Sequence, residues 1–298
     1  MAAGLHISLS AEPVAYLGNF AITNSMLTGL LVSALLILFA IAVNVSLDSQ
    51  TNKPKGLQNF AELLVESFYN FCNMIANDTK KAKLFLPFIA TFFLFIMLNN
   101  WTGLIPGVGS IMVPIPESPS HSSATIAEET VPEVVVVTEE HGEEITTKVS
   151  VVEKPAEEAE EVHVKKTALF RAQTADLNTT IALGLLTIAL TQVFGFKYLK
   201  LGYLKKYINF SSPIYFFVGI LELVSEFAKI ISFAFRLFGN IFAGEVLIAV
   251  LLHLTKVVIP IPFYGLELFV GMMQALVFSM LSLVFYTMAT QAHEEHEH

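Results

Sequence analysis

Five long apolar runs divide the chain, and each is long enough to cross a lipid bilayer. A hydrocarbon core about 30 Å thick requires about 20 residues of α-helix. The runs lie at residues 26–47, 84–105, 177–196, 213–252 and 263–290. Their lengths predict an all-α polytopic membrane protein with five membrane helices.

Residues 57–77 follow a different pattern, which predicts an amphipathic helix. Apolar side chains recur every three or four residues from Leu57 to Ile75, whereas Glu62 and Glu66 fall outside this stripe. A helix with one apolar face and one polar face lies along the membrane surface or packs on a partner. We therefore expect one surface helix between the first two membrane spans.

The last two apolar runs are longer than a bilayer requires. At 1.5 Å per residue, the helix predicted from Pro213 to Leu252 extends about 60 Å. Pro260 and Pro262 then mark a turn, and residues 263–290 add about 42 Å of helix. A helix longer than the hydrocarbon thickness tilts or bends, so we expect a C-terminal hairpin of long tilted helices.

Charge is concentrated in one segment between the second and third apolar runs. The chain is 54% hydrophobic and only 14% charged, whereas soluble proteins average about 25% charged residues. Residues 106–168 contain thirteen Glu and four Lys, which accounts for the whole net charge of −9. Within this acidic insert, β-branched runs at 134–138 and 145–152 predict a β-hairpin, and a solvated disordered loop is an equal alternative.

These patterns divide the chain into four parts. They are residues 1–105 with two spans and the surface helix, 106–170 with the acidic insert, 171–212 with the third span and a basic loop, and 213–298 with the long hairpin. Nine lysines lie in the connections 48–83 and 197–210, and positive charge in short loops favours the cytoplasm. The N-terminus and the insert are therefore expected outside, and the C-terminus in the cytoplasm.

One arginine lies far from either end of a predicted membrane helix. The chain has only two arginines, and Arg236 is near the middle of the run 213–252. An intramembrane Arg costs about 2.5 kcal/mol or more and stays protonated, so it indicates a counter-charge or an ion path. The alternative is a structural Arg that a carboxylate of the same chain neutralises.

Carboxylates occur on both sides of Arg236 along the predicted hairpin and its neighbour. They are Glu222 and Glu226 toward the cytoplasmic end, and Glu245, Glu267 and Asp176 toward the outer end. Membrane-buried carboxylates can take up and release protons near neutral pH. Two acidic half-paths separated by a permanent cation would carry protons without leaking.

Each acid also has a simpler interpretation. A single Glu can snorkel to the interface, and Asp176 precedes Asn178 at the start of the third span, where Asp often caps a helix. Two uncharged polar residues also lie close to these charged groups along the helices. Asn240 shares the helix face of Arg236, and Gln274 shares that of Glu267 because seven residues separate them.

The sequence around Arg236 resembles subunit a of F-type ATP synthases, the stator of their membrane motor. The resemblance rests on FRLFGN at 235–240 and AGE at 243–245, and it continues through QALVF at 274–278 and ADLN at 175–178. It also includes Glu222, Lys229 and the PIP turn at 260–262. It covers nearly the whole chain except the acidic insert, which is longer than the family usually has.

The resemblance implies a role for each candidate residue. Arg236 would face a ring of c subunits, interact with each ring carboxylate in turn, and stop protons from passing directly between two half-channels. Glu222 matches the inner exit. The residues that match the outer path or the surroundings of the arginine are Asn240, Glu245, Glu267, Gln274 and Asp176.

The resemblance also implies partners and a location. The partners would be the c-subunit ring, the b-subunit peripheral stalk, other ATP synthase subunits and membrane lipid, and the location the bacterial inner membrane. The sequence contains no Gly-rich phosphate loop, so we expect a non-catalytic subunit that binds no cofactor and no nucleic acid.

Two other classes of protein fit the sequence less well. An ion-coupled secondary transporter usually shows paired internal repeats and interrupted helices, and neither is evident. A membrane scaffold without transport would leave Arg236 and the membrane acids unexplained.

The acidic insert is expected to be dispensable for rotation, because it contains no long apolar run. Replacing residues 117–166 with a short Gly-Ser linker should preserve assembly and change ion pumping mainly at low ionic strength, since charges act over about 8 Å at physiological salt. Pumping by membrane vesicles at low and physiological salt measures this. Complete loss of assembly would instead identify the insert as a docking element.

Overall fold

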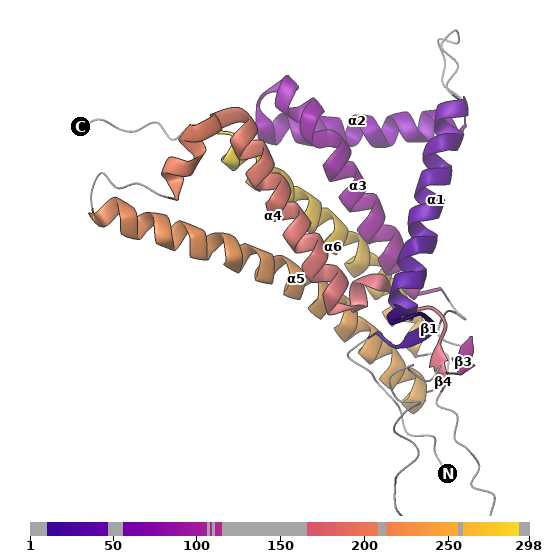
Figure 1. Cartoon of the computed structure of the whole chain (residues 1–298). Helices are drawn as coiled ribbons and strands as arrows, with labels where there is room; N and C mark the ends of the chain where they lie inside the picture. Colours follow the sequence, from indigo (N-terminus) through magenta and orange to yellow (C-terminus); the bar gives the residue numbers. More distant parts are fainter. Residues whose placement is uncertain are drawn as a thin grey trace, which may run out of the picture.

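A computed structural model describes residues 11–46, 56–105, 108, 111–114, 166–207, 213–255 and 259–291 (Figure 1). Six α-helices dominate these residues. They are α1 (Asn24–Ser46), α2 (Leu57–Ala76), α3 (Thr79–Gly103), α4 (Leu177–Leu199), α5 (Pro213–Thr255) and α6 (Pro260–Ala289). All but α2 are long and apolar enough to cross a membrane. This confirms the predicted all-α polytopic class.

Helix α3 begins at Thr79, five residues before the start that the apolar run at 84–105 predicts. The Asp78 side chain caps the helix by accepting a hydrogen bond from the backbone N–H of Lys80 at 2.8 Å. Lys81 extends to the far end of α6, where its ammonium donates to the carbonyl of Thr290 at 3.1 Å. Hydropathy places this boundary too late because lysine stems can lie along a helix while their charged ends reach polar groups.

Helix α2 lies across the ends of α1 and α3 (Figure 1), as expected of a surface helix. Its buried side chains are Phe68, Cys72 and Ala76, and the rings of Phe68 and Phe93 of α3 are 4.9 Å apart. Burial raises the pKa of the Cys72 thiol to about 11. The thiol therefore stays protonated and unreactive at neutral pH.

The core of the molecule lies where α3, α4 and α6 meet. Phe85, Phe194 and Tyr286, one from each helix, form a cluster with ring centroids 5.0 to 5.6 Å apart. Tilted and edge-to-face aromatic pairs contribute about 0.5–1.5 kcal/mol each beyond their burial. Helix α5 packs on this body through Phe233, whose ring is 4.8 Å from that of Phe278 on α6.

Helices α5 and α6 run antiparallel and form the predicted long hairpin (Figure 1). Helix α5 has 43 residues, which corresponds to about 65 Å, and α6 has 30 residues. In Figure 1, α5 crosses obliquely to α1 and α3. Helix α6 starts at Pro260, where a proline loses no intrahelical hydrogen bond.

Gly184 allows α4 and α5 to approach closely. A Cβ atom at this position would lie 3.0 Å from the backbone carbonyl oxygen of Ile230 on α5. Only a residue without a side chain fits this contact without a shift of one helix. The close approach holds the N-terminal half of α5 against α4.

Two small antiparallel sheets were not expected. Strands β1 (Pro13–Leu17) and β2 (Phe20–Thr23) form a hairpin before α1, and β3 (Met112–Pro114) pairs with β4 (Lys166–Ala168). The hairpin predicted at 134–138 and 145–152 lies outside the described residues. The β3–β4 pair joins the two flanks of the acidic insert. Because Lys166 belongs to β4, a linker that replaces the insert should end at residue 165.

The two ends of the bundle differ in what they carry. Both small sheets lie at one end, near the start of α1. Helix α2, the short helix η3 (Lys200–Lys206) and the end of α6 lie at the other (Figure 1). Which side of the membrane each end faces stays a prediction.

Substitution of Gly184 by Leu is expected to destabilise the bundle by about 1–3 kcal/mol, because overpacking forces α4 and α5 apart. Thermal unfolding of the purified protein in detergent measures the effect as a lower midpoint. Ala182→Leu is the matched control, since Ala182 is exposed on the same helix. Equal midpoints for the two variants would show that the Gly184 contact does not limit stability.

Candidate functional site

Arg236 lies on the exposed side of α5. Its Nη2 donates a hydrogen bond to Oγ of Ser232, one turn earlier, at 3.3 Å. The guanidinium carbon is 6.0 Å from the ring centroid of Phe233. Arg236 has no carboxylate partner among the residues that the structure describes. The alternative of an arginine neutralised within its own chain therefore gains no support from these residues.

The predicted polar neighbours of Arg236 lie near it. Gln274 of α6 and Arg236 line the same narrow crevice between α5 and α6, together with Phe233, Leu237 and Phe278. Asn240 is exposed one turn after Arg236. Arg236, Asn240 and Gln274 thus form a cluster of polar side chains along this part of α5 and α6.

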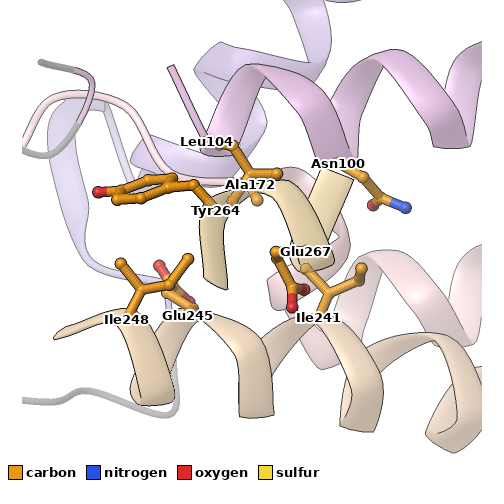
Figure 2. Close-up of a pocket in the computed structure, with 9 residues that line it drawn as sticks. Asn100, Leu104, Ala172, Ile241, Glu245, Ile248, Tyr264 and Glu267 are labelled. Atoms are coloured by element: carbon orange, nitrogen blue, oxygen red, sulfur yellow. The ribbon is translucent and has the colours of Figure 1, made fainter. Parts of the chain in front are cut away.

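Glu245 and Glu267 line a common cavity of about 80 Å³ (Figure 2). Its lining residues come from α3, from α5, from α6 and from the segment that precedes α4. They are Asn100, Gly103, Leu104, Ala172, Ile241, Glu245, Ile248, Tyr264 and Glu267. A cavity of this size has room for water, and its two carboxylates and the Asn100 amide offer polar partners for it. The structure therefore brings two of the predicted outer carboxylates together.

The two carboxylates have different surroundings. The side chain of Glu245 is 41% exposed, whereas Glu267 is only 8% exposed. Oε1 of Glu267 is buried without a hydrogen-bond partner among the described residues. A buried carboxylate with an unsatisfied oxygen is costly unless it is protonated or hydrated. Glu267 is therefore suited to holding a proton or a cavity water.

Gly244 brings the Glu267 carboxylate against the backbone of α5. A Cβ atom at position 244 would collide with that carboxylate. The glycine just before Glu245 therefore determines where the carboxylate of Glu267 can lie. This explains why the AGE motif at 243–245 contains a residue without a side chain at its centre.

Arg171 is a site residue that the sequence analysis missed. Its Nε and Nη2 donate hydrogen bonds to Oε2 of Glu245 at 3.2 and 3.1 Å. The sequence pattern indicates a role for Arg236 and none for this second arginine. The scarcity of arginine was one signal. The chain has only two, and Arg171 lies five residues before Asp176, at the start of a membrane helix.

Asp176 has a local structural role. It is the N-cap of α4 and accepts a hydrogen bond from the backbone N–H of Asn178 at 3.1 Å. Its other carboxylate oxygen accepts a hydrogen bond from the hydroxyl of Ser25 on α1 at 3.0 Å. Asp176 is 7% exposed and does not line the cavity of Glu245 and Glu267. Its place in an ion path stays a prediction.

At the other end of α5, two acids are arranged differently from the outer pair. Glu222 is partly buried, and Glu226 is buried and accepts a hydrogen bond from the ammonium of Lys229 at 2.8 Å. That ammonium also lies 5.0 Å from the ring centroid of Phe285. Lys229 lies seven residues before Arg236 and so on the same face of α5. Its ammonium forms an ion pair with Glu226.

Short helix η3 meets this inner acidic region. Burial raises the pKa of Tyr203, and the hydrogen bond with Tyr207 and the negative charges of Glu226 and Glu222 raise it further. Both carboxylates thus act electrostatically on η3. An apolar hollow of about 420 Å³ lies beside them, lined by residues of α4, η3 and α5 that include Glu226 and Tyr207.

Comparison with known proteins gives a consistent result. The family model described as "ATP synthase A chain" matches residues 26–287. The chain is also 30% identical over 257 residues to "ATP synthase subunit a, chloroplastic" of Stigeoclonium helveticum. This alignment covers 86% of the chain and 80% of the relative.

Proposed function

Because the chain belongs to the ATP synthase subunit a family, we propose that it forms two proton half-channels against a ring of c subunits and couples proton flow to ring rotation. Members of this family are the proton-translocating membrane subunit and not the catalytic subunit. The single observation that carries the proposal is the exposed guanidinium of Arg236, which has no carboxylate partner among the described residues. A ring carboxylate would supply the missing counter-charge.

The outer half-channel is assigned to the cavity of Glu245 and Glu267 and to the polar group that leads to Arg236. A proton entering at the more exposed Glu245 would pass to the buried Glu267 through cavity water, and then toward Asn240 and Gln274. The first step leads from the more exposed carboxylate to the buried one, and the second returns toward the exposed face of α5 that carries Arg236. Asp176 is assigned to the outer mouth, where it holds the start of α4.

The inner half-channel is assigned to Glu222 at the opposite end of α5. Glu222 is partly buried beside η3. It can therefore receive a proton from the ring and release it on the side of the membrane where the lysine-rich loops lie. Arg236 lies between the inner and outer acids and bars a direct path, because its charge repels an excess proton. Each proton that crosses 100 mV gains about 2.3 kcal/mol, so several must be collected for each ATP.

The proposed orientation follows the distribution of lysines. The end with α2 and η3 faces the cytoplasm, because short loops rich in Lys remain there. The N-terminal hairpin and the acidic insert then face outside, and the C-terminus is cytoplasmic. We assign the protein to a bacterial inner membrane, with a b-subunit peripheral stalk as a further partner. The secondary-transporter alternative loses its support with the family assignment.

Arg236→Ala is expected to reduce ATP-driven proton pumping to background while the subunit still assembles, because a neutral residue cannot attract a ring carboxylate. Arg236→Lys should also be severely impaired, since an ammonium lacks the planar guanidinium and can lose its proton when desolvated. Pumping by inverted vesicles and copurification of the complex measure the two properties. Coupled pumping at the wild-type rate in Arg236→Ala would refute the role.

Glu245 and Glu267 are expected to act in one outer path. The double variant Glu245→Gln with Glu267→Gln should slow proton flow far more than Glu66→Gln, a control on the exposed side of α2. Passive proton flow through vesicles stripped of the soluble ATPase sector measures the effect. Equal rates in the double variant and the control would mean that the two carboxyl groups only line the cavity.

A further inference from the structure

The contact between Arg171 and Glu245 joins the segment after the acidic insert to α5. Two guanidinium nitrogens donate to one carboxylate oxygen, Oε2, at 3.2 and 3.1 Å. Oε1 of Glu245 accepts no hydrogen bond from the described residues. The carboxylate is therefore held by one oxygen while the other stays available.

Arg171 is itself held in place on two sides. Its backbone N–H donates to Oγ1 of Thr28 on α1 at 3.2 Å. Its guanidinium lies 5.9 Å from the ring centroid of Phe242 on α5, within the range of a cation–π contact. The Arg171 side chain is 9% exposed, against 41% for Glu245. A buried guanidinium is costly without a counter-charge, which favours a lasting contact with Glu245.

The contact lies at the cavity that Glu245 shares with Glu267. Ala172, the residue after Arg171, also lines this cavity. A Cβ atom at Gly103 of α3 would collide with the Ala172 side chain, so the segment is packed closely on α3 as well. Arg171 therefore approaches Glu245 from a rigid wall of the cavity.

We propose that Arg171 is the positioning residue of the outer proton path. It fixes the Glu245 carboxylate through Oε2 and leaves Oε1 as the oxygen that exchanges protons with the cavity. This proposal rests on the proposed function of Glu245. In this role Arg171 acts through Glu245 and does not itself carry the proton.

The competing explanation is a structural clamp, in which the ion pair only attaches the segment after the insert to α5. A clamp would work equally well with the two charges exchanged. A positioning residue would not, because the exchange moves the carboxylate away from α5 and from Glu267. The two explanations therefore predict different results for a charge swap.

The test is a double-mutant cycle in the assembled ATP synthase. Passive proton flow is measured in vesicles stripped of the soluble sector for Arg171→Gln, Glu245→Gln and the double variant, with copurification as the measure of assembly. Each single variant should lower the flow about tenfold, and the double should be no slower than Glu245→Gln, because interacting residues are not additive. Multiplying effects in the double variant would overturn the proposal.

Two further variants keep the test informative if Arg171→Gln assembles poorly. Arg171→Lys retains the charge but can offer only one ammonium in place of two fixed N–H groups, so flow should be intermediate. The swap Arg171→Glu with Glu245→Arg should restore assembly without restoring flow. Wild-type flow in the swap would make the pair a structural clamp and overturn the positioning role.

The cycle also separates this proposal from the function on which it rests. If Glu245→Gln lowers the flow and Arg171→Gln does not, the positioning role is wrong and the outer path stands. If Glu245→Gln alone leaves the flow at the wild-type rate, both the outer path through Glu245 and the role of Arg171 are wrong.

Discussion

A fixed positive charge inside a bilayer requires a counter-charge or a route to water, and this requirement organises α5. A buried guanidinium outside the spans has the same need, and the two arginines of the chain meet it in opposite ways. Arg171 is largely buried and paired with Glu245, whereas Arg236 is exposed and has no carboxylate partner among the described residues. Arg171 has a counter-charge within the fold, whereas under the proposed function a ring carboxylate supplies the counter-charge of Arg236.

Under the proposed function, the exposed guanidinium of Arg236 must stay at one position relative to the ring, so α5 must be held firmly. Helix α5 is held beside Arg236 by the contact of Phe233 with Phe278 and, further along the helix, by the close approach at Gly184. The aromatic cluster of α3, α4 and α6 supports these contacts. The apolar core therefore determines where the polar side chains around Arg236 lie.

The membrane helices could be predicted from the sequence because the length of an apolar run is a local property. The sharing of a cavity by Glu245 and Glu267 was also foreseeable, since an antiparallel hairpin brings the end of α5 beside the start of α6. The contact of Glu226 with Lys229 could have been predicted from their spacing of three residues. The contact of Arg171 with Glu245 could not, because it joins residues 74 apart on separate elements. Helical periodicity carries no information about such a pair.

The β3–β4 pair has a consequence for how the chain can vary. It brings together Pro114 and Lys166, the two residues on either side of residues 115–165, in adjacent strands. Once two ends are held in this way, the entropy of closing the loop between them grows only with the logarithm of its length, by about 0.6 kcal/mol for each doubling. Insertions or deletions between the strands therefore cost little free energy and displace no membrane helix. This point of the chain can accept a longer or shorter segment, or a fused domain, while the geometry around Arg236 is retained.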